Sequence, residues 1–183
     1  AIIFIAFSFM QGKIAGYVIF DWSDSKDEKN NFDITRTYFQ YTDDISDNLF
    51  FKVRFDVGRI KEESDQKLRV FLKNSYVDWK CKASNIFSLG LIGTNSYSVQ
   101  ENTWGNRFVE KSPLDKGKLT NTADFGIGYS HSFVDKKTWR AYNDIHLNIQ
   151  FLNGEGYGGE EVNSNKAIFL RLLYGEKKLN ENN

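Results

Sequence analysis

The sequence predicts an all-β fold, an antiparallel transmembrane β-barrel of which about eight strands are present. Two patterns in the 183 residues indicate this class. Apolar and polar residues alternate along eight segments, and the connections between these segments are long and short in turn. Successive side chains of a strand point to opposite faces, so each segment has one apolar and one polar face. Outer-membrane barrels combine this alternation with short turns at one end and longer loops at the other.

The segment 49–57 shows the alternation most clearly. One face would carry Leu49, Phe51, Val53, Phe55 and Val57, and the other Phe50, Lys52, Arg54 and Asp56. The eight predicted strands are 13–22, 32–42, 49–58, 68–80, 86–94, 123–133, 139–152 and 166–175. No segment shows a clear helical period. Alternation alone does not say which face lies inside, because a soluble barrel would place its apolar face inward.

The lengths of the connections favour the membrane barrel over a soluble one. The long, polar connections are 23–31, 59–67, 95–122 and 153–165. The short connections between them are 43–48, 81–85 and 134–138. A soluble sandwich or ligand-binding barrel has no reason to separate its loops by length in this way, whereas a membrane barrel does.

Composition excludes several other classes of protein. Lys plus Arg and Asp plus Glu number 24 each, so there is no basic excess for binding nucleic acid. The single cysteine, Cys81, excludes an internal disulfide framework. His131 and His146 have no cysteine or carboxylate at metal-ligand spacing. We therefore predict a protein that is not an enzyme and that has no cofactor or metal.

The first residues differ from the rest of the chain. Ala1 to Met10 form the only long apolar run, and we interpret 1–12 as the remnant of a secretory signal peptide. A buried first strand is the alternative. No run of about 18 apolar residues predicts a spanning helix. The barrel region is then 13–183. Its last residues, 178–183, are similar to the turn at 44–48 that precedes a strand, so a ninth strand and a longer barrel are expected.

Aromatic residues make up 16% of the chain and gather at the ends of predicted strands. Such residues form girdles at the two membrane interfaces of barrels. Ordinary strand propensity, which also favours aromatic residues, is the alternative explanation. The candidates for a girdle are Tyr17, Trp22, Tyr41, Trp79, Trp139 and Tyr174.

Four short stretches resemble one family of proteins. They are 90–95, with two glycines; 100–101, ending in Glu101; 107–112, from Arg107 to Ser112; and 125–128, with a Gly-x-Gly pattern. With them the chain resembles, over most of 13–175, the porin family that includes the phosphate-selective porins O and P. The resemblance implies a bacterial outer-membrane pore of about 16–18 strands, usually a homotrimer, through which small hydrophilic solutes or ions diffuse.

The resemblance also implies that the third external loop, 95–122, folds into the barrel and narrows the pore. The candidates for this constriction are Glu101, Arg107, Glu110 and Lys111. The candidates for the surrounding lumen wall are Arg36, Lys52, Arg54, Asp56 and Lys73. Basic rings favour anions and carboxylate rings favour cations, and this mixed set has a slight basic excess. The ladder of basic residues that serves phosphate in the family is not evident. For each residue, pairing with a neighbour inside the lumen is the alternative.

Two other functions stay open at this level. A complete eight-stranded barrel would be filled by its own side chains and would have a structural or adhesive role. A soluble ligand-binding β-barrel would turn its apolar face inward. The membrane hypothesis predicts lipid and lipopolysaccharide as partners, together with small solutes or anions and no nucleic acid. Acidic loop residues could contact lipopolysaccharide cations or only solvate the loops: Asp24, Asp27, Glu28, Glu155, Glu160 and Glu161.

Overall fold

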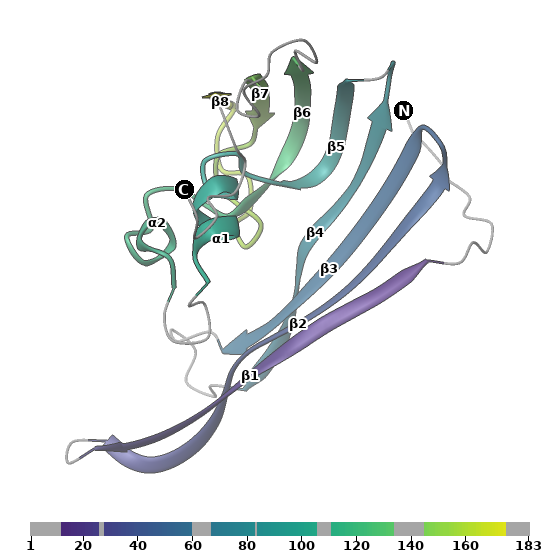
Figure 1. Ribbon diagram of the computed structural model, residues 1–183. Helices are drawn as coiled ribbons and strands as arrows, with labels where there is room; N and C mark the ends of the chain where they lie inside the picture. The colour runs from purple at the N-terminus through teal and green to yellow at the C-terminus, as the bar shows by residue number, and fades with distance from the viewer. Residues whose placement is uncertain are drawn as a thin grey trace.

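The computed structural model describes residues 12–25, 28–59, 67–82, 84–105, 111–133 and 145–174. They form one antiparallel sheet whose eight strands are ordered as in the sequence (Figure 1). The strands are β1 Lys13–Ser25, β2 Glu28–Ser46, β3 Leu49–Arg59, β4 Leu68–Lys80, β5 Asn85–Gly93, β6 Ala123–Phe133, β7 Ile145–Leu152 and β8 Ala167–Tyr174. The predicted all-β class and antiparallel order are confirmed. Residues 139–144, predicted as the start of the seventh strand, lie outside the described residues.

The sheet is strongly curled, but it is open (Figure 1). β1 and β8 are its two edges, and they are not paired with each other. A closed eight-stranded barrel needs that pairing, so the described strands do not form the complete small barrel considered above. An edge strand presents unpaired N–H and C=O groups, which in a stable barrel are paired with a further strand.

The first connection differs from the prediction. A long loop was expected at 23–31, but β1 and β2 continue as a hairpin to Ser25 and from Glu28. Side chains support this extension: the ring of Trp22 stacks on Phe32 with centroids 6.4 Å apart, and its indole N–H donates to Asn30 Oδ1 at 2.8 Å. Cross-strand aromatic pairs of this kind stabilise a hairpin. Residues 60–66 and 134–144, which include most of two other predicted connections, lie outside the described part.

The third long connection is not structureless. It contains α1, Ser98–Thr103, and α2, Pro113–Lys116, which both lie on the concave side of the sheet (Figure 1). Helices of six and four residues are too short to produce a recognisable hydrophobic period, which is why the sequence did not reveal them. Neither helix in the described part of the chain is long and apolar enough to cross a membrane.

A bulge in β4 keeps polar residues on the concave face. In β4, Arg54 pairs with Asn74 and Phe55 with Leu72, so Lys73 is an extra residue opposite β3. Lys73 and Asn74 are both buried as a result, 8% and 6% exposed. A bulge of this kind reverses the alternation of faces along a strand. The sequence carries its trace, because the apolar positions of β4 change from Leu68, Val70 and Leu72 to Val77 and Trp79.

The convex face is apolar and exposed along most of the sheet. Val70 is 67% exposed, Leu89 53%, Ile127 52% and Leu170 69%. They lie on four strands, β4, β5, β6 and β8, and the cross-strand partners of Leu89 and Leu170 on this face are Ile127 and Ile149. Contiguous apolar surfaces of this extent mark a membrane or a partner surface.

Apolar burial in the described part is limited and is centred where the sheet meets the third connection. Leu91 and Ile92 of β5, Ala123 of β6 and Leu152 of β7 are at most 3% exposed, and so is Tyr97, which follows β5. We call residues 94–122 the insertion. This small core is formed by the insertion and the strands beneath it, so it fixes the insertion against one half of the concave face.

Candidate functional site

The candidate site begins with the attachment of the insertion to the wall formed by β6, β7 and β8. Gln150 of β7 is 5% exposed, and its side chain bonds to residues on both sides of the first turn of the insertion. Its Oε1 accepts the backbone N–H of Asn95 at 2.8 Å, and its Nε2 donates to the carbonyl of Gly93 at 2.8 Å. Asn95 Nδ2 donates to Asn148 Oδ1 at 2.8 Å, and Arg171 of β8 donates to the Asn95 carbonyl at 2.6 Å and to Ser98 Oγ.

Within the insertion, further hydrogen bonds join α1 to α2. The hydroxyl of Ser112, which is fully buried, donates to Glu101 Oε1 at 2.5 Å. The backbone N–H of Leu114 donates to Gln100 Oε1 at 3.1 Å. Tyr97 donates its hydroxyl proton toward the carbonyls of Leu114 and Thr120. The two described parts of the insertion, 94–105 and 111–122, are therefore held together by these bonds.

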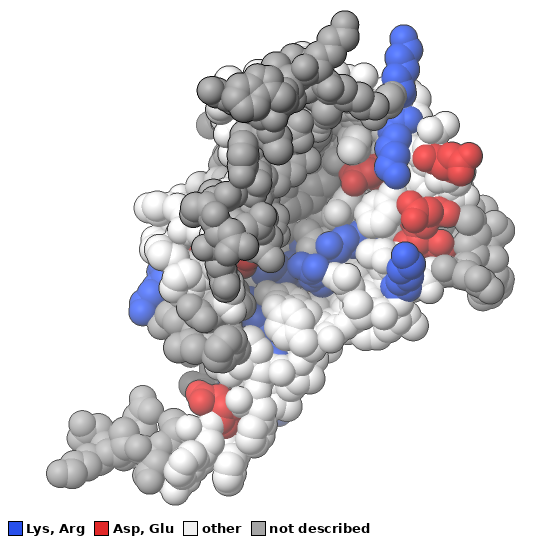
Figure 2. Space-filling model, in the orientation of Figure 1, with Lys and Arg blue, Asp and Glu red and all other residues white. Residues whose placement is uncertain are grey.

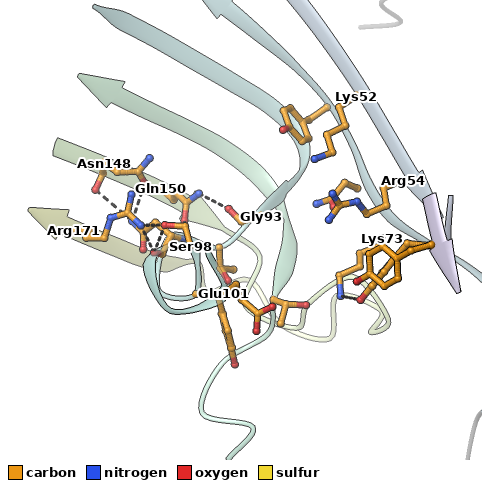
Figure 3. Close-up of a pocket in the computed structure, with 17 residues that line it drawn as sticks. Lys52, Arg54, Lys73, Gly93, Ser98, Glu101, Asn148, Gln150 and Arg171 are labelled. Atoms are coloured by element: carbon orange, nitrogen blue, oxygen red, sulfur yellow. Dashed lines mark hydrogen bonds between the residues drawn. The ribbon is translucent and has the colours of Figure 1, made fainter. Parts of the chain in front are cut away.

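A cavity of about 310 Å³ separates the insertion from the opposite wall of β2, β3 and β4. In Figure 3, Lys52, Arg54 and Lys73 lie on this wall and face the insertion, while Ser98, Glu101 and Arg171 lie across the cavity. Figure 2 shows basic side chains gathered in the hollow of the molecule. The lining residues are Tyr17, Tyr38, Lys52, Arg54, Lys73, Asn74, Tyr76, Gly93, Thr94, Asn95, Tyr97, Ser98, Glu101, Thr122, Asn148, Gln150 and Arg171.

The charge of this lining is unbalanced. Four of the lining residues are cations, Lys52, Arg54, Lys73 and Arg171, whereas Glu101 is the one carboxylate among them. Side chains with one sign of charge in a cleft with low-dielectric walls attract ions of the opposite sign. The cavity is therefore electropositive, and this charge balance favours anions over cations in the space between insertion and wall.

Basic and acidic side chains surround Tyr38 at one end of the cavity. Arg36 Nη1 and Lys73 Nζ donate to the Tyr38 hydroxyl at 2.6 and 3.0 Å. Asp56, 4% exposed, lies 3.5 Å from Arg36 and 3.8 Å from Lys73. The guanidinium of Arg54 lies 5.5 Å from the centroid of the Tyr38 ring. We call Arg36, Tyr38, Asp56 and Lys73 the wall cluster.

A second cavity, of about 620 Å³, lies on the other side of the wall cluster. Arg36 and Asp56 line it, as do Gly58 and the glycine-rich connection around Tyr157. Lys73 Nζ lies 5.3 Å from the centroid of the Tyr157 ring. Burial raises the pKa of Tyr157, and the neighbouring Asp56 carboxylate adds to this rise, so the phenol stays neutral at ordinary pH. The wall cluster thus contributes residues to both cavities and lies at their junction.

The structure places the five predicted wall residues together. Arg36 of β2, Lys52, Arg54 and Asp56 of β3, and Lys73 of β4 all line one of the two cavities. In part they also pair with one another, as the alternative interpretation expected: Asp56 pairs with Arg36 and Lys73.

The predicted constriction residues are less fully placed. Glu101 lines the first cavity from α1, opposite the wall. Lys111 is exposed, just before α2, and does not line either cavity described above. Arg107 and Glu110 lie outside the described residues.

The sequence did not predict that Arg171 lines the cavity on the side opposite Lys52, Arg54 and Lys73. It also did not predict most of the tyrosines that line this cavity. Arg171 was recognisable, since it is the only charged residue among the apolar residues of its strand. Gln150 and Asn95 gave no signal, because their contact joins positions 55 residues apart. Of the residues suggested for the girdle, Tyr17, Trp22, Trp79 and Tyr174 are exposed, and Tyr17 also lines the cavity.

Each of the two histidines of the chain lies within hydrogen-bond distance of a neutral side chain. His131 Nδ1 lies 2.8 Å from Asn85 Oδ1, and His146 Nδ1 lies 2.8 Å from Ser132 Oγ. Among the residues that the structure describes, no three histidine, cysteine, aspartate or glutamate side chains gather as metal ligands.

Comparison with known proteins gives no assignment. No family model, no curated protein and no solved structure matches the chain.

Proposed function

We propose that the protein forms the wall of a pore in the bacterial outer membrane, through which small hydrophilic solutes or ions diffuse. The observation that carries this proposal is the distribution of polarity over the curled sheet. Its convex face exposes apolar side chains such as Leu89 and Ile127, while its concave face carries charged and amide groups around two cavities. A soluble barrel has the opposite distribution, and a membrane pore has this one.

Strand length and the insertion support the same proposal. β3, β5 and β6 have 11, 9 and 11 residues, and a tilted strand needs about 9–11 residues to cross the hydrocarbon core. The insertion narrows the concave space, as a constriction loop does. A closed pore also needs strands beyond these eight to join the edges β8 and β1, and barrels with an aqueous channel have about 16–18 strands.

Lipid and lipopolysaccharide would then surround the convex face, and association into trimers is part of the proposal. The loop ion pair between Lys166 Nζ and Glu161 Oε2, at 3.0 Å, is a candidate for contact with lipopolysaccharide. The hydrogen bond from Lys166 lowers the pKa of Glu161, so this carboxylate stays ionised at neutral pH.

Conductance tests the proposal. The protein is refolded in detergent and added to a planar lipid bilayer in potassium chloride. Stepwise, lasting increases in current are the expected result. A folded, heat-modifiable protein that never conducts would favour a structural barrel, and a protein that stays soluble without detergent would contradict the membrane proposal.

A further inference from the structure

Two adjacent cross-strand pairs on the β3–β4 wall carry hydrogen-bond donors that point to one shared cavity. Lys52 pairs with Tyr76 and Arg54 with Asn74 in the register of the two strands. Paired side chains on one face lie about 5 Å apart, and the next pair along the strands lies about 7 Å away. All four residues line the cavity of about 310 Å³.

Within the described part of the chain, these donors are not used by the protein itself. The Lys52 ammonium, the Asn74 amide and the Tyr76 hydroxyl make no hydrogen bond there, although the Asp78 carboxylate interacts electrostatically with Lys52. Asn74 is 6% exposed. Arg54 donates through Nε and Nη2 to Gln40 Oε1, at 2.9 and 2.5 Å, which leaves Nη1 for another acceptor. By contrast, the neighbouring Lys73 is held by Tyr38 and Asp56.

The Asn74 side chain is mostly buried but borders the cavity, so its amide is open to an acceptor placed there. Ammonium and guanidinium groups are donors only, and a carboxylate accepts several of their hydrogen bonds at once. The one carboxylate that lines this cavity, Glu101, accepts a hydrogen bond from Ser112 on the far side. An acceptor for the donors on the β3–β4 wall is therefore expected to come from a solute in the cavity.

The rest of the lining favours an organic solute over a small inorganic ion. Rings or hydroxyls of Tyr17, Tyr38, Tyr76 and Tyr97 border the same space. Its volume of about 310 Å³ lies at the lower end of the range for small-molecule sites, which typically combine aromatic walls with a few placed polar groups.

We propose that Lys52, Arg54, Asn74 and Tyr76 form a binding subsite for the carboxylate of a small organic anion, whose body lies against the tyrosines of the cavity. This inference rests on the proposed function, because it names the solute class of the same pathway. Binding is weak enough for the solute to leave, as conduction requires.

The test measures block of the chloride current through the reconstituted protein by galacturonate, which carries a carboxylate on a sugar ring. Galactose has the same ring without the charge, and inorganic phosphate has charge without the ring. Galacturonate is expected to reduce the current at concentrations at which galactose has no effect. At the same concentrations, the reduction of the current by phosphate is expected to be at least about tenfold smaller.

Lys52→Gln is expected to weaken the block by galacturonate about tenfold, because it removes one charge-assisted hydrogen bond. Lys82→Asn is the matched control. It removes the same charge at an exposed turn, where the residue has φ 65°, a conformation that asparagine tolerates. This variant is expected to keep the wild-type block.

The outcomes separate this inference from the function on which it rests. Absence of any conductance contradicts the pore itself. Conductance that galacturonate blocks no better than phosphate, or that Lys52→Gln and Lys82→Asn affect alike, overturns the carboxylate subsite and leaves the pore in place. The heat-modifiable shift of Lys52→Gln in gel electrophoresis is compared with that of the wild type, which shows whether the variant folds. Tyr76→Phe removes only a hydroxyl and provides a second variant, for which a severalfold weaker block by galacturonate is expected.

Discussion

At the scale of single residues, the close approach of β5 to β4 and of β6 to β7 depends on glycine. Gly90 has φ +123°, and a Cβ atom built on it would lie 2.3 Å from the carbonyl oxygen of Ser75. Gly126, its direct partner on β6, would place a Cβ 2.0 Å from the carbonyl oxygen of Phe151. Two glycines thus face each other where the wall passes beneath the insertion.

Gly90→Ala is expected to lower the free energy of unfolding by at least about 1–3 kcal/mol, since both its backbone angle and its surroundings reject a side chain. Gly58→Ala is the control, because a Cβ at Gly58 meets nothing within 4 Å. Urea unfolding of the detergent-folded protein, followed by tryptophan fluorescence, measures both. Equal losses in the two variants would show that the close approach at Gly90 is not important for stability.

Asp56 provides a second prediction at this scale. Its carboxylate is the acidic member of the wall cluster, between Arg36 and Lys73. Asp56→Asn removes a fixed negative charge from the pathway, so the reversal potential in a salt gradient is expected to shift toward stronger anion preference. Asp21→Asn, at an exposed position of β1, is expected to leave the potential unchanged. A shift toward cations in Asp56→Asn would contradict the placement of the wall cluster in the pathway.

At the scale of elements, alternation was sufficient to predict where the strands lie. The expected segments 68–80 and 123–133 coincide with β4 and β6, because one apolar and one polar face leave a period of two in the sequence. The bulge at Lys73 also leaves a trace in the sequence, because the positions of the apolar residues in β4 shift by one residue after it. The hairpin extension of β1 and β2 leaves no such trace, since polar residues in a projecting hairpin look like a loop.

The docking of the insertion could not be predicted from local patterns. It depends on contacts such as Asn95 to Gln150 and Arg171 to Asn95, which join distant positions through individual hydrogen bonds. Such contacts leave no periodicity in the sequence. The family resemblance suggested that 95–122 folds inward, and the structure places both of its helices on the concave side.

Gln150→Ala is expected to loosen the insertion, because it removes the two hydrogen bonds that Gln150 makes where the insertion begins, with the Asn95 N–H and the Gly93 carbonyl. Leaving the buried Asn95 N–H unpaired costs about 1–3 kcal/mol. The expected results are faster tryptic cleavage within 94–122 and a larger single-channel conductance. Thr42→Ala, on the concave wall of β2, is the control. An insertion that is cut at the same rate in Gln150→Ala and in the wild type would contradict its attachment through Gln150.

At the scale of the whole molecule, the account depends on which face of the sheet meets lipid. Ile127→Arg, near the middle of β6 on the convex face, is expected to destabilise the folded protein in lipid by about 2–4 kcal/mol. Thr42→Arg, which adds the same charge to the concave face, is expected to be tolerated there. Urea titration in lipid vesicles measures the two, and a larger loss for Thr42→Arg would reverse the assignment of faces.

The most direct test of the central claim is the accessibility of spin labels in the reconstituted protein. Cys81 is the only cysteine, so a Cys81→Ser background accepts single labelling sites. Labels are placed at Val70 and Ile127 on the convex face and at Thr42 and Ser130 on the concave face. The account predicts that oxygen, which concentrates in the hydrocarbon core, relaxes the convex labels most strongly, while a water-soluble nickel complex relaxes the concave ones. The reverse pattern, or equal access of the nickel complex to all four labels, would contradict a sheet that faces lipid outside and water inside.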